Sequence, residues 1–175
     1  MIRFFQGVVL CMLLGSCGVQ EAVPKIAKIV LDPSTPVGPP SEQPSKIALH
    51  AYAAAEVNKG FDEAPSPVIV RVFALSSDHR LFGMDFFSIA ADAAGALGVT
   101  LLDELDENML APDSYKILGP YELPARTRHI GVVAEYIDID TAVWRASIDV
   151  QAVGADDRLL LLLLEEEIRL FTEDG

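Results

Sequence analysis

Short segments in which apolar and polar residues alternate recur along the chain after residue 45, and they limit its fold more than any other feature. An alternation with a period of two places the apolar side chains on one face of a β-strand, so each segment predicts a half-buried strand. Turn residues separate the segments, which favours a mainly β fold, an antiparallel β-sandwich. We expect six strands, at residues 46–57, 68–75, 115–123, 128–137, 143–153 and 158–171.

A segment between the second and third predicted strands has helical spacing instead. Asp85 is a residue type that begins helices and Gly98 one that ends them, and apolar residues recur between them every three or four positions. A second apolar set predicts another helical turn or two before residue 112: Leu101, Leu102, Leu105 and Met109. We expect this small helical insertion to cover one end of the sandwich. Phe86 and Phe87 are interpreted as core residues, with a ligand pocket as the alternative.

Six consecutive leucines occupy residues 159–164, and Glu165, Glu166 and Glu167 follow them directly. The run is far shorter than the ~20 apolar residues that a helix needs to span a bilayer. We interpret it as part of a last strand that is buried on both faces. The alternative is an exposed apolar edge that meets a partner or another copy of the chain.

The first 17 residues have the organisation of an export signal. Arg3 is followed by an apolar stretch at residues 7–14, which is too short to span a bilayer, and then by Gly15, Ser16 and Cys17. The sequence Leu-Gly-Ser-Cys at residues 14–17 resembles the lipobox of bacterial lipoproteins, in which the peptide is cut before an acylated cysteine. Cys11 lacks small residues before it and is the weaker candidate. We therefore expect a signal peptide at residues 1–16 and lipidation of Cys17.

The stretch from Cys17 to residue 45 is rich in proline, which is typical of a partly stiff tether. We therefore expect the lipidated cysteine and tether at residues 17–45 and the sandwich domain at residues 46–175. The apolar patch at residues 26–31 either adds an edge strand to the domain or belongs to the tether. Gly18, and not an aspartate, follows Cys17, which favours the outer membrane over the inner one.

Charge and motifs both argue for a protein that works by binding. The formal net charge of −13 argues against nucleic acid, because phosphate binding needs clustered lysine and arginine. The mature chain has no Gly-x-Ser-x-Gly motif and no Cys–His pair, and its histidines (His50, His79 and His129) are isolated. Carboxylates at residues 103–107 and 138–140 are interpreted as solvated or turn residues and not as calcium ligands. We expect no cofactor, no metal and no enzymatic activity.

Four separate patches resemble one family in their order and spacing. They are NKGFDEAPSPVIVRVFAL at residues 58–75, FGMDFF at 82–87, HIGVVAEY at 129–136 and DTAVWR at 140–145. Together with the lipobox, they are similar to the type VI secretion lipoproteins called TssJ or SciN. The likeness extends over nearly everything from residue 46 to residue 153.

The resemblance implies a transthyretin-like β-sandwich with a helical insertion, anchored in the outer membrane and facing the periplasm. Members of this family bind the periplasmic C-terminal domain of the inner-membrane protein TssM, which with TssL forms the envelope-spanning membrane complex. In the family, much of this contact is made by the loop between the first two sandwich strands. That loop maps to Asn58, Lys59, Gly60, Phe61, Asp62, Glu63, Ala64, Pro65 and Ser66.

Within that loop, Phe61 is interpreted as an aromatic anchor for the partner, and the alternative is that it folds back on the sandwich. Arg71, Trp144 and Arg145 are expected to hold the fold together. A function of another class stays open beside this one. In it, the chain is a periplasmic lipoprotein that binds a small ligand or glycan at the sandwich end near Phe86 and Trp144.

Overall fold

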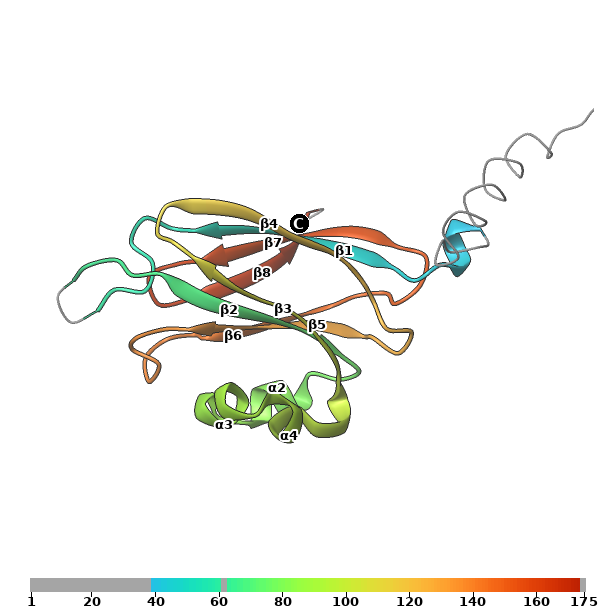
Figure 1. The fold of residues 1–175 in the computed structure, drawn as a ribbon, viewed down its shortest axis with the longest axis horizontal. Coiled ribbons are helices and arrows are strands. Elements are labelled where there is room, and N and C mark those ends of the chain that lie inside the picture. The colour runs from blue at the N-terminus through green and yellow to red at the C-terminus, as the bar shows by residue number, and fades with distance from the viewer. Residues whose placement is uncertain (1–38, 61–62, 174–175) are drawn as a thin grey trace, which may run out of the picture. The chain divides into compact units, whose positions relative to one another are not determined.

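The computed structural model describes residues 39–60 and 63–173. Two four-stranded sheets face each other, with strand orders β4-β1-β7-β8 and β3-β2-β5-β6 (Figure 1). The strands of the first sheet are β1 (Lys46–Ala53), β4 (Ser114–Glu122), β7 (Asp156–Leu163) and β8 (Ile168–Thr172). Those of the second sheet are β2 (Val68–Leu75), β3 (Leu101–Leu110), β5 (His129–Glu135) and β6 (Arg145–Asp149). The predicted β-sandwich is confirmed.

Alternation along the strands explains why the two sheets stack. Every second residue of β1 points between the sheets, so Ile47, Leu49 and Ala51 are fully buried against Val70 and Val72 of β2. Burying an aliphatic side chain of this size contributes about 1.5–3 kcal/mol. The first five predicted strands match β1, β2, β4, β5 and β6 to within a few residues at each end.

Strand β1 lies inside its sheet and pairs in two different directions. It runs antiparallel to β4 and parallel to β7, with Leu49 opposite Leu159 in the parallel pair. The other paired strands of the two sheets are antiparallel. The parallel pair joins segments about one hundred positions apart in the sequence. The predicted sandwich had antiparallel strands, so this parallel pair was not expected.

Residues 101–110 form strand β3, so the prediction of further helical turns there was wrong. Leu101, Leu105 and Met109 are four positions apart, a spacing that fits one face of a regular strand as well as one face of a helix. A register shift in the pairing with β2 alters this in β3, where Leu105 packs on the core between the sheets and Leu101 packs beneath the helical insertion. Pairing with β2 decides between helix and strand, because Ile69 lies opposite Met109 and Arg71 opposite Glu107. Tertiary pairing therefore overrides the local pattern.

The first five leucines of the run, residues 159–163, belong to β7, which is not the last strand. A turn at the glutamates leads into β8, so the single strand predicted at 158–171 is a hairpin. Leu159, Leu161 and Leu163 are buried, whereas Leu160 is 37% exposed, so burial on both faces was wrong. The edge alternative was also wrong, because β7 lies between β1 and β8.

The helical insertion covers the outer face of the sheet β3-β2-β5-β6 and not an end of the sandwich (Figure 1). It comprises α2 (His79–Gly83), α3 (Phe86–Ala91), α4 (Ala93–Leu97) and the 3-10 turn η2 (Gly98–Thr100). A second core cluster forms beneath it, in which Leu81, Ile89 and Leu97 pack on Phe73 and Leu75 of β2.

Two aspartates explain how the insertion is divided. Asp85 caps α3 as predicted, because its carboxylate accepts a hydrogen bond from the Ser88 amide at 2.9 Å. Asp92 ends α3 and caps α4 in the same way, through the Gly95 amide, so the single predicted helix is two helices. Phe86 packs at the edge of the second core cluster, but Phe87 is 67% exposed, so its assignment to the core was wrong.

The folded domain begins a few residues before position 46. After the 3-10 turn η1 (Pro40–Glu42), Ser45 is fully buried; its amide donates to the Ala152 carbonyl at 2.9 Å and its hydroxyl accepts from the Ala155 amide at 3.0 Å. The end of the predicted tether is therefore bonded to the β6–β7 connection. The predicted signal peptide, Cys17 and the apolar patch at 26–31 lie outside the described residues.

Candidate functional site

Three connections meet at one end of the sandwich, here called the loop end: residues 54–67, 136–144 and 164–167 (Figure 1). Asn58 joins all three. Its backbone amide donates to the Glu165 carbonyl at 3.0 Å, its side-chain oxygen accepts from the Ile137 amide at 2.7 Å, and its side-chain nitrogen donates to the Pro67 carbonyl at 2.8 Å. One residue, through its backbone amide and its side chain together, thus fixes how these three loops lie relative to each other.

Asn58 also has a backbone conformation that few residue types adopt. Its φ is 52°, in the left-handed region that asparagine tolerates better than most residues, and its side chain is only 3% exposed. Among the predicted contact residues it therefore lies inside the protein, where it positions the loop. The sequence prediction missed this role, although an asparagine followed closely by a glycine is a signal of such a turn.

The other described residues of the predicted loop lie at or near the protein surface. Glu63, Ala64 and Pro65 are exposed, while Gly60 and Ser66 are half-buried. The loop closes on itself, because the Gly60 amide donates to the Ala64 carbonyl at 3.3 Å and the Glu63 amide donates to the Gly60 carbonyl at 3.0 Å. Phe61 and Asp62 lie outside the described residues, so the anchor role of Phe61 stays a prediction.

Lys59 contributes little free positive charge to the loop end. Its ammonium lies 2.7 Å from Glu56 and 3.2 Å from Glu165, and the hydrogen bonds that it donates to these carboxylates raise the pKa of Lys59. Glu63, Asp138 and Glu166 border a hollow beside it, and within the described part of the chain they form no ion pair. The loop end is therefore acidic.

The aromatic region expected for a small ligand lies on the neighbouring side of the molecule. The rings of Phe86 and Trp144 meet edge to face with centroids 5.4 Å apart, and Arg145 lies over Trp144 at 4.3 Å. Arg145 donates to the carbonyls of Leu81 and Met84 at 2.8 and 2.5 Å, which holds the end of α2. The Arg145 guanidinium is the polar group best placed to orient a ligand there, but its hydrogen bonds are already used to hold α2.

Arg71 has the same kind of role at α3. Its guanidinium donates to the carbonyls of Ile89 and Ala90, and it forms ion pairs with Glu104 at 3.4 Å and Glu107 at 3.3 Å. The predictions that Arg71 and Arg145 hold the fold together are confirmed.

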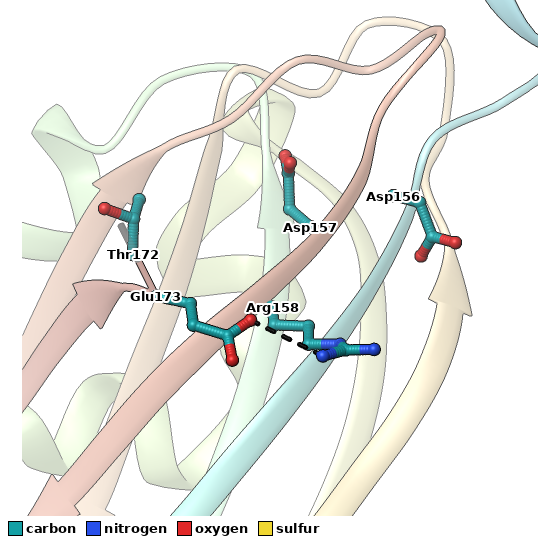
Figure 2. A pocket seen from close by; sticks show the side chains of 5 residues that line it. All are labelled: Asp156, Asp157, Arg158, Thr172 and Glu173. Carbon is teal, nitrogen blue, oxygen red and sulfur yellow. Dashed lines mark ion pairs between the residues drawn. The ribbon is translucent and has the colours of Figure 1, made fainter. Parts of the chain in front are cut away.

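A further hollow lies at the opposite end of the first sheet, beside the start of β7. Figure 2 shows Arg158 turned toward Glu173, at 3.7 Å, while the carboxylates of Asp156 and Asp157 point in different directions. Because these two carboxylates do not point toward one place, they are not arranged to bind a single ion or ligand together.

Among the described histidines, His129 lies beside carboxylates, 2.8 Å from Asp149 and 4.0 Å from Asp78. His79 contacts the Ser77 hydroxyl at 2.9 Å, but in residues 39–60 and 63–173 no carboxylate contacts that histidine to orient it as a base. The same residues contain no group of three or more His, Cys, Asp or Glu placed to hold a metal ion. None of the helices described here is long and apolar enough to cross a membrane.

Comparison with known proteins gives a consistent result. Residues 45–167 match the family described as Type VI secretion lipoprotein, VasD, EvfM, TssJ. Among solved structures, the lipoprotein TssJ1 from Pseudomonas aeruginosa is 26% identical with a TM-score of 0.69, covering 75% of this chain and 98% of that one. The Serratia marcescens protein Lip, a membrane-bound component of the type VI secretion system, is 28% identical with a TM-score of 0.66, covering 72% and 96%.

A chain in a structure of the type VI membrane complex shares the fold at 18% identity, with a TM-score of 0.63 over 74% of this chain and 99% of that one. No curated protein sequence matches this chain.

Proposed function

Because the chain belongs to the type VI secretion lipoprotein family, we propose that it is a structural subunit of the type VI secretion membrane complex. In this proposal Cys17, multiply acylated, anchors it in the outer membrane, and the sandwich faces the periplasm. Two or more acyl chains hold a protein durably, which one chain does not. The sandwich binds the periplasmic C-terminal domain of TssM and through it is linked indirectly to TssL.

The observation that carries the partner assignment is the family match over residues 45–167, which includes the whole of the loop at residues 58–66. The geometry supports it, because Asn58 fixes the base of this loop while Glu63, Ala64 and Pro65 are exposed at the loop end. A loop that is held before binding loses less conformational entropy when it meets its partner.

Titration of the full chain, purified in detergent, against the periplasmic C-terminal domain of TssM from the same organism tests this proposal. We expect saturable binding that Phe61→Ala and a Gly/Ser replacement of residues 59–63 both weaken. The control replaces Ala125 and Arg126, in the β4–β5 connection, by Gly and Ser. Absence of binding by a folded chain at high micromolar concentration would refute the partner assignment.

A further inference from the structure

The helical insertion leaves one row of its sheet uncovered. Helix α3 lies over the outer face from Arg71 onward, where the guanidinium reaches the Ile89 carbonyl. The next row toward the loop end consists of Met109, Ile69 and Glu135, which are neighbours in the strand register. Met109 is 63% exposed and belongs to neither of the two core clusters.

This row is the floor of a shallow groove, here called the side groove, which runs between α3 and the loop end. Ile69 and Met109 line it together with Pro67, Phe86 and Ile137. Ile137 is 50% exposed and borders both the side groove and the acidic hollow beside Lys59. The apolar groove and the hollow beside Lys59 therefore form one continuous surface.

The rim of this surface carries negative charge that the protein itself does not neutralise. Lys59 and Arg71 are paired with glutamates, and Arg145 is bonded to carbonyl groups of α2. Within the described residues, no ion pair forms at four carboxylates that line the groove or the hollow: Glu63, Glu135, Asp138 and Glu166. A docking group with positive charge would complement this rim.

We propose that the side groove is a second part of the partner-binding surface, and that it receives an apolar side chain of the partner flanked by lysine or arginine. This inference rests on the proposed function and extends the contact beyond the loop of residues 58–66. The side groove is open and shallow. It therefore suits one protruding side chain of a protein better than a small molecule, which usually binds in an enclosed pocket. An apolar anchor within a charged rim is the usual arrangement at the centre of an interface.

The apolar part is tested in the same titration with Met109→Asp and Ile137→Asp. Their matched control is Ile117→Asp, which changes an isoleucine that is 54% exposed on β4, in the other sheet. We expect each groove variant to weaken binding by about tenfold or more and the control to leave it unchanged. Melting temperatures measured alongside show that the variants are folded, and Ile137→Ser serves as a milder second variant.

The charged part is tested with the double variant Glu135→Gln, Asp138→Asn. Its control, Asp156→Asn with Asp157→Asn, removes the same formal charge at the opposite end of the domain. We expect the first pair to weaken binding several-fold and to reduce its dependence on salt, because screening acts on the charges that face the partner. The control pair should change neither.

The outcomes separate this inference from the proposed function. If the wild-type chain does not bind, the proposed function is wrong. If the wild-type chain binds and the loop replacement weakens it, but the groove variants behave like Ile117→Asp, the side-groove proposal alone is wrong. Equal or stronger weakening by Ile117→Asp would likewise overturn it and place the contact on the other sheet.

Discussion

Asn58 shows how much of the loop end depends on a single side chain. It is buried, it satisfies an amide of one loop and a carbonyl of another, and it adopts a positive φ. An unsatisfied buried polar group costs about 1–3 kcal/mol, and the left-handed conformation costs most other residues about 1–2 kcal/mol. The identity of this residue is thus set by the fold, although it lies at the start of the predicted contact loop.

We expect Asn58→Ala to lower the free energy of unfolding by about 3 kcal/mol, through lost hydrogen bonds and backbone strain together. Asn58→Gly loses the same side-chain hydrogen bonds but avoids the backbone strain, so it should lower the free energy of unfolding by less. Chemical denaturation of both variants measures this. Asn108→Ala is the control, because the Asn108 side chain bonds only the surface residue Lys116 in the described structure, and its loss should cost under about 0.5 kcal/mol. Equal losses for Asn58→Ala and Asn108→Ala would contradict the role given to Asn58.

Asp85 links stability to pH at the start of α3. Hydrogen bonds from the Ser88 hydroxyl and amide lower the pKa of Asp85, so the folded protein favours the carboxylate. A group whose pKa is lowered by folding stabilises the protein above its unfolded pKa, and this contribution disappears as the pH falls through the folded value. The capping effect should therefore be present at neutral pH and absent in acid.

We expect Asp85→Ala to lower the melting temperature by about 2–4 °C at neutral pH. The difference from wild type should shrink below about pH 4, where the unfolded carboxyl is protonated. Asp85→Ser is the control, because serine also caps helices but does not titrate, so its difference from wild type should vary much less. A gap between Asp85→Ala and wild type that stays constant down to about pH 3 would contradict this account.

At the scale of elements, the sequence predicted what local patterns can specify. Alternation located β1, β2, β4, β5 and β6, and the aspartate at position 85 marked the start of α3. The prediction failed at β3, because a spacing of four suits a helix and a strand equally. It also failed at β8, because the β7–β8 turn contains glutamates and no Gly or Pro that would have marked it. The side groove was not predictable, since its floor is assembled by the register of β3, β2 and β5.

The packing of α2 on β5 depends on a glycine. A Cβ atom at Gly131 would lie 2.7 Å from Leu75 Cδ1 and 2.9 Å from Leu81 Cδ2, and both leucines are fully buried. We expect Gly131→Ala to lower the free energy of unfolding by about 1–3 kcal/mol, because the packed cluster has little room to yield. Gly83→Ala is the matched control, because no atom beyond its chain neighbours and its own helix backbone lies within 4 Å of its added Cβ. Equal stability of the two variants in urea denaturation would contradict this explanation.

At the scale of the whole molecule, attachment and recognition are assigned to different parts of the chain. The proposed anchor, Cys17, lies in the N-terminal segment, whereas the loop end and the side groove belong to the sandwich. The formal net charge of −13 gives the protein no electrostatic affinity for an anionic bilayer. In the proposed function, membrane attachment therefore comes from the lipid on Cys17.

We expect Cys17→Ser, combined with the signal peptide of a soluble periplasmic protein in place of residues 1–16, to move the protein from the membrane fraction to the soluble periplasmic fraction, because the acyl chains are lost while the signal peptide is still removed. Cell fractionation followed by immunoblotting measures this. Cys11→Ser is the control and should leave the protein with the membrane. Retention of the Cys17→Ser protein in the membrane fraction would show that another segment anchors it.

The parallel pairing of β1 with β7 has a consequence for the order in which the domain forms. A chain that emerges N-terminus first, from a ribosome or a secretion pore, presents β1 long before either neighbour, because β4 begins at Ser114 and β7 at Asp156. Contacts so distant in sequence make folding slow. Until β4 has emerged, β1 has both edges open, and the edge that pairs with β7 stays open until nearly the whole chain has emerged. This strand is therefore the segment that a holding chaperone in the export compartment would have most reason to shield.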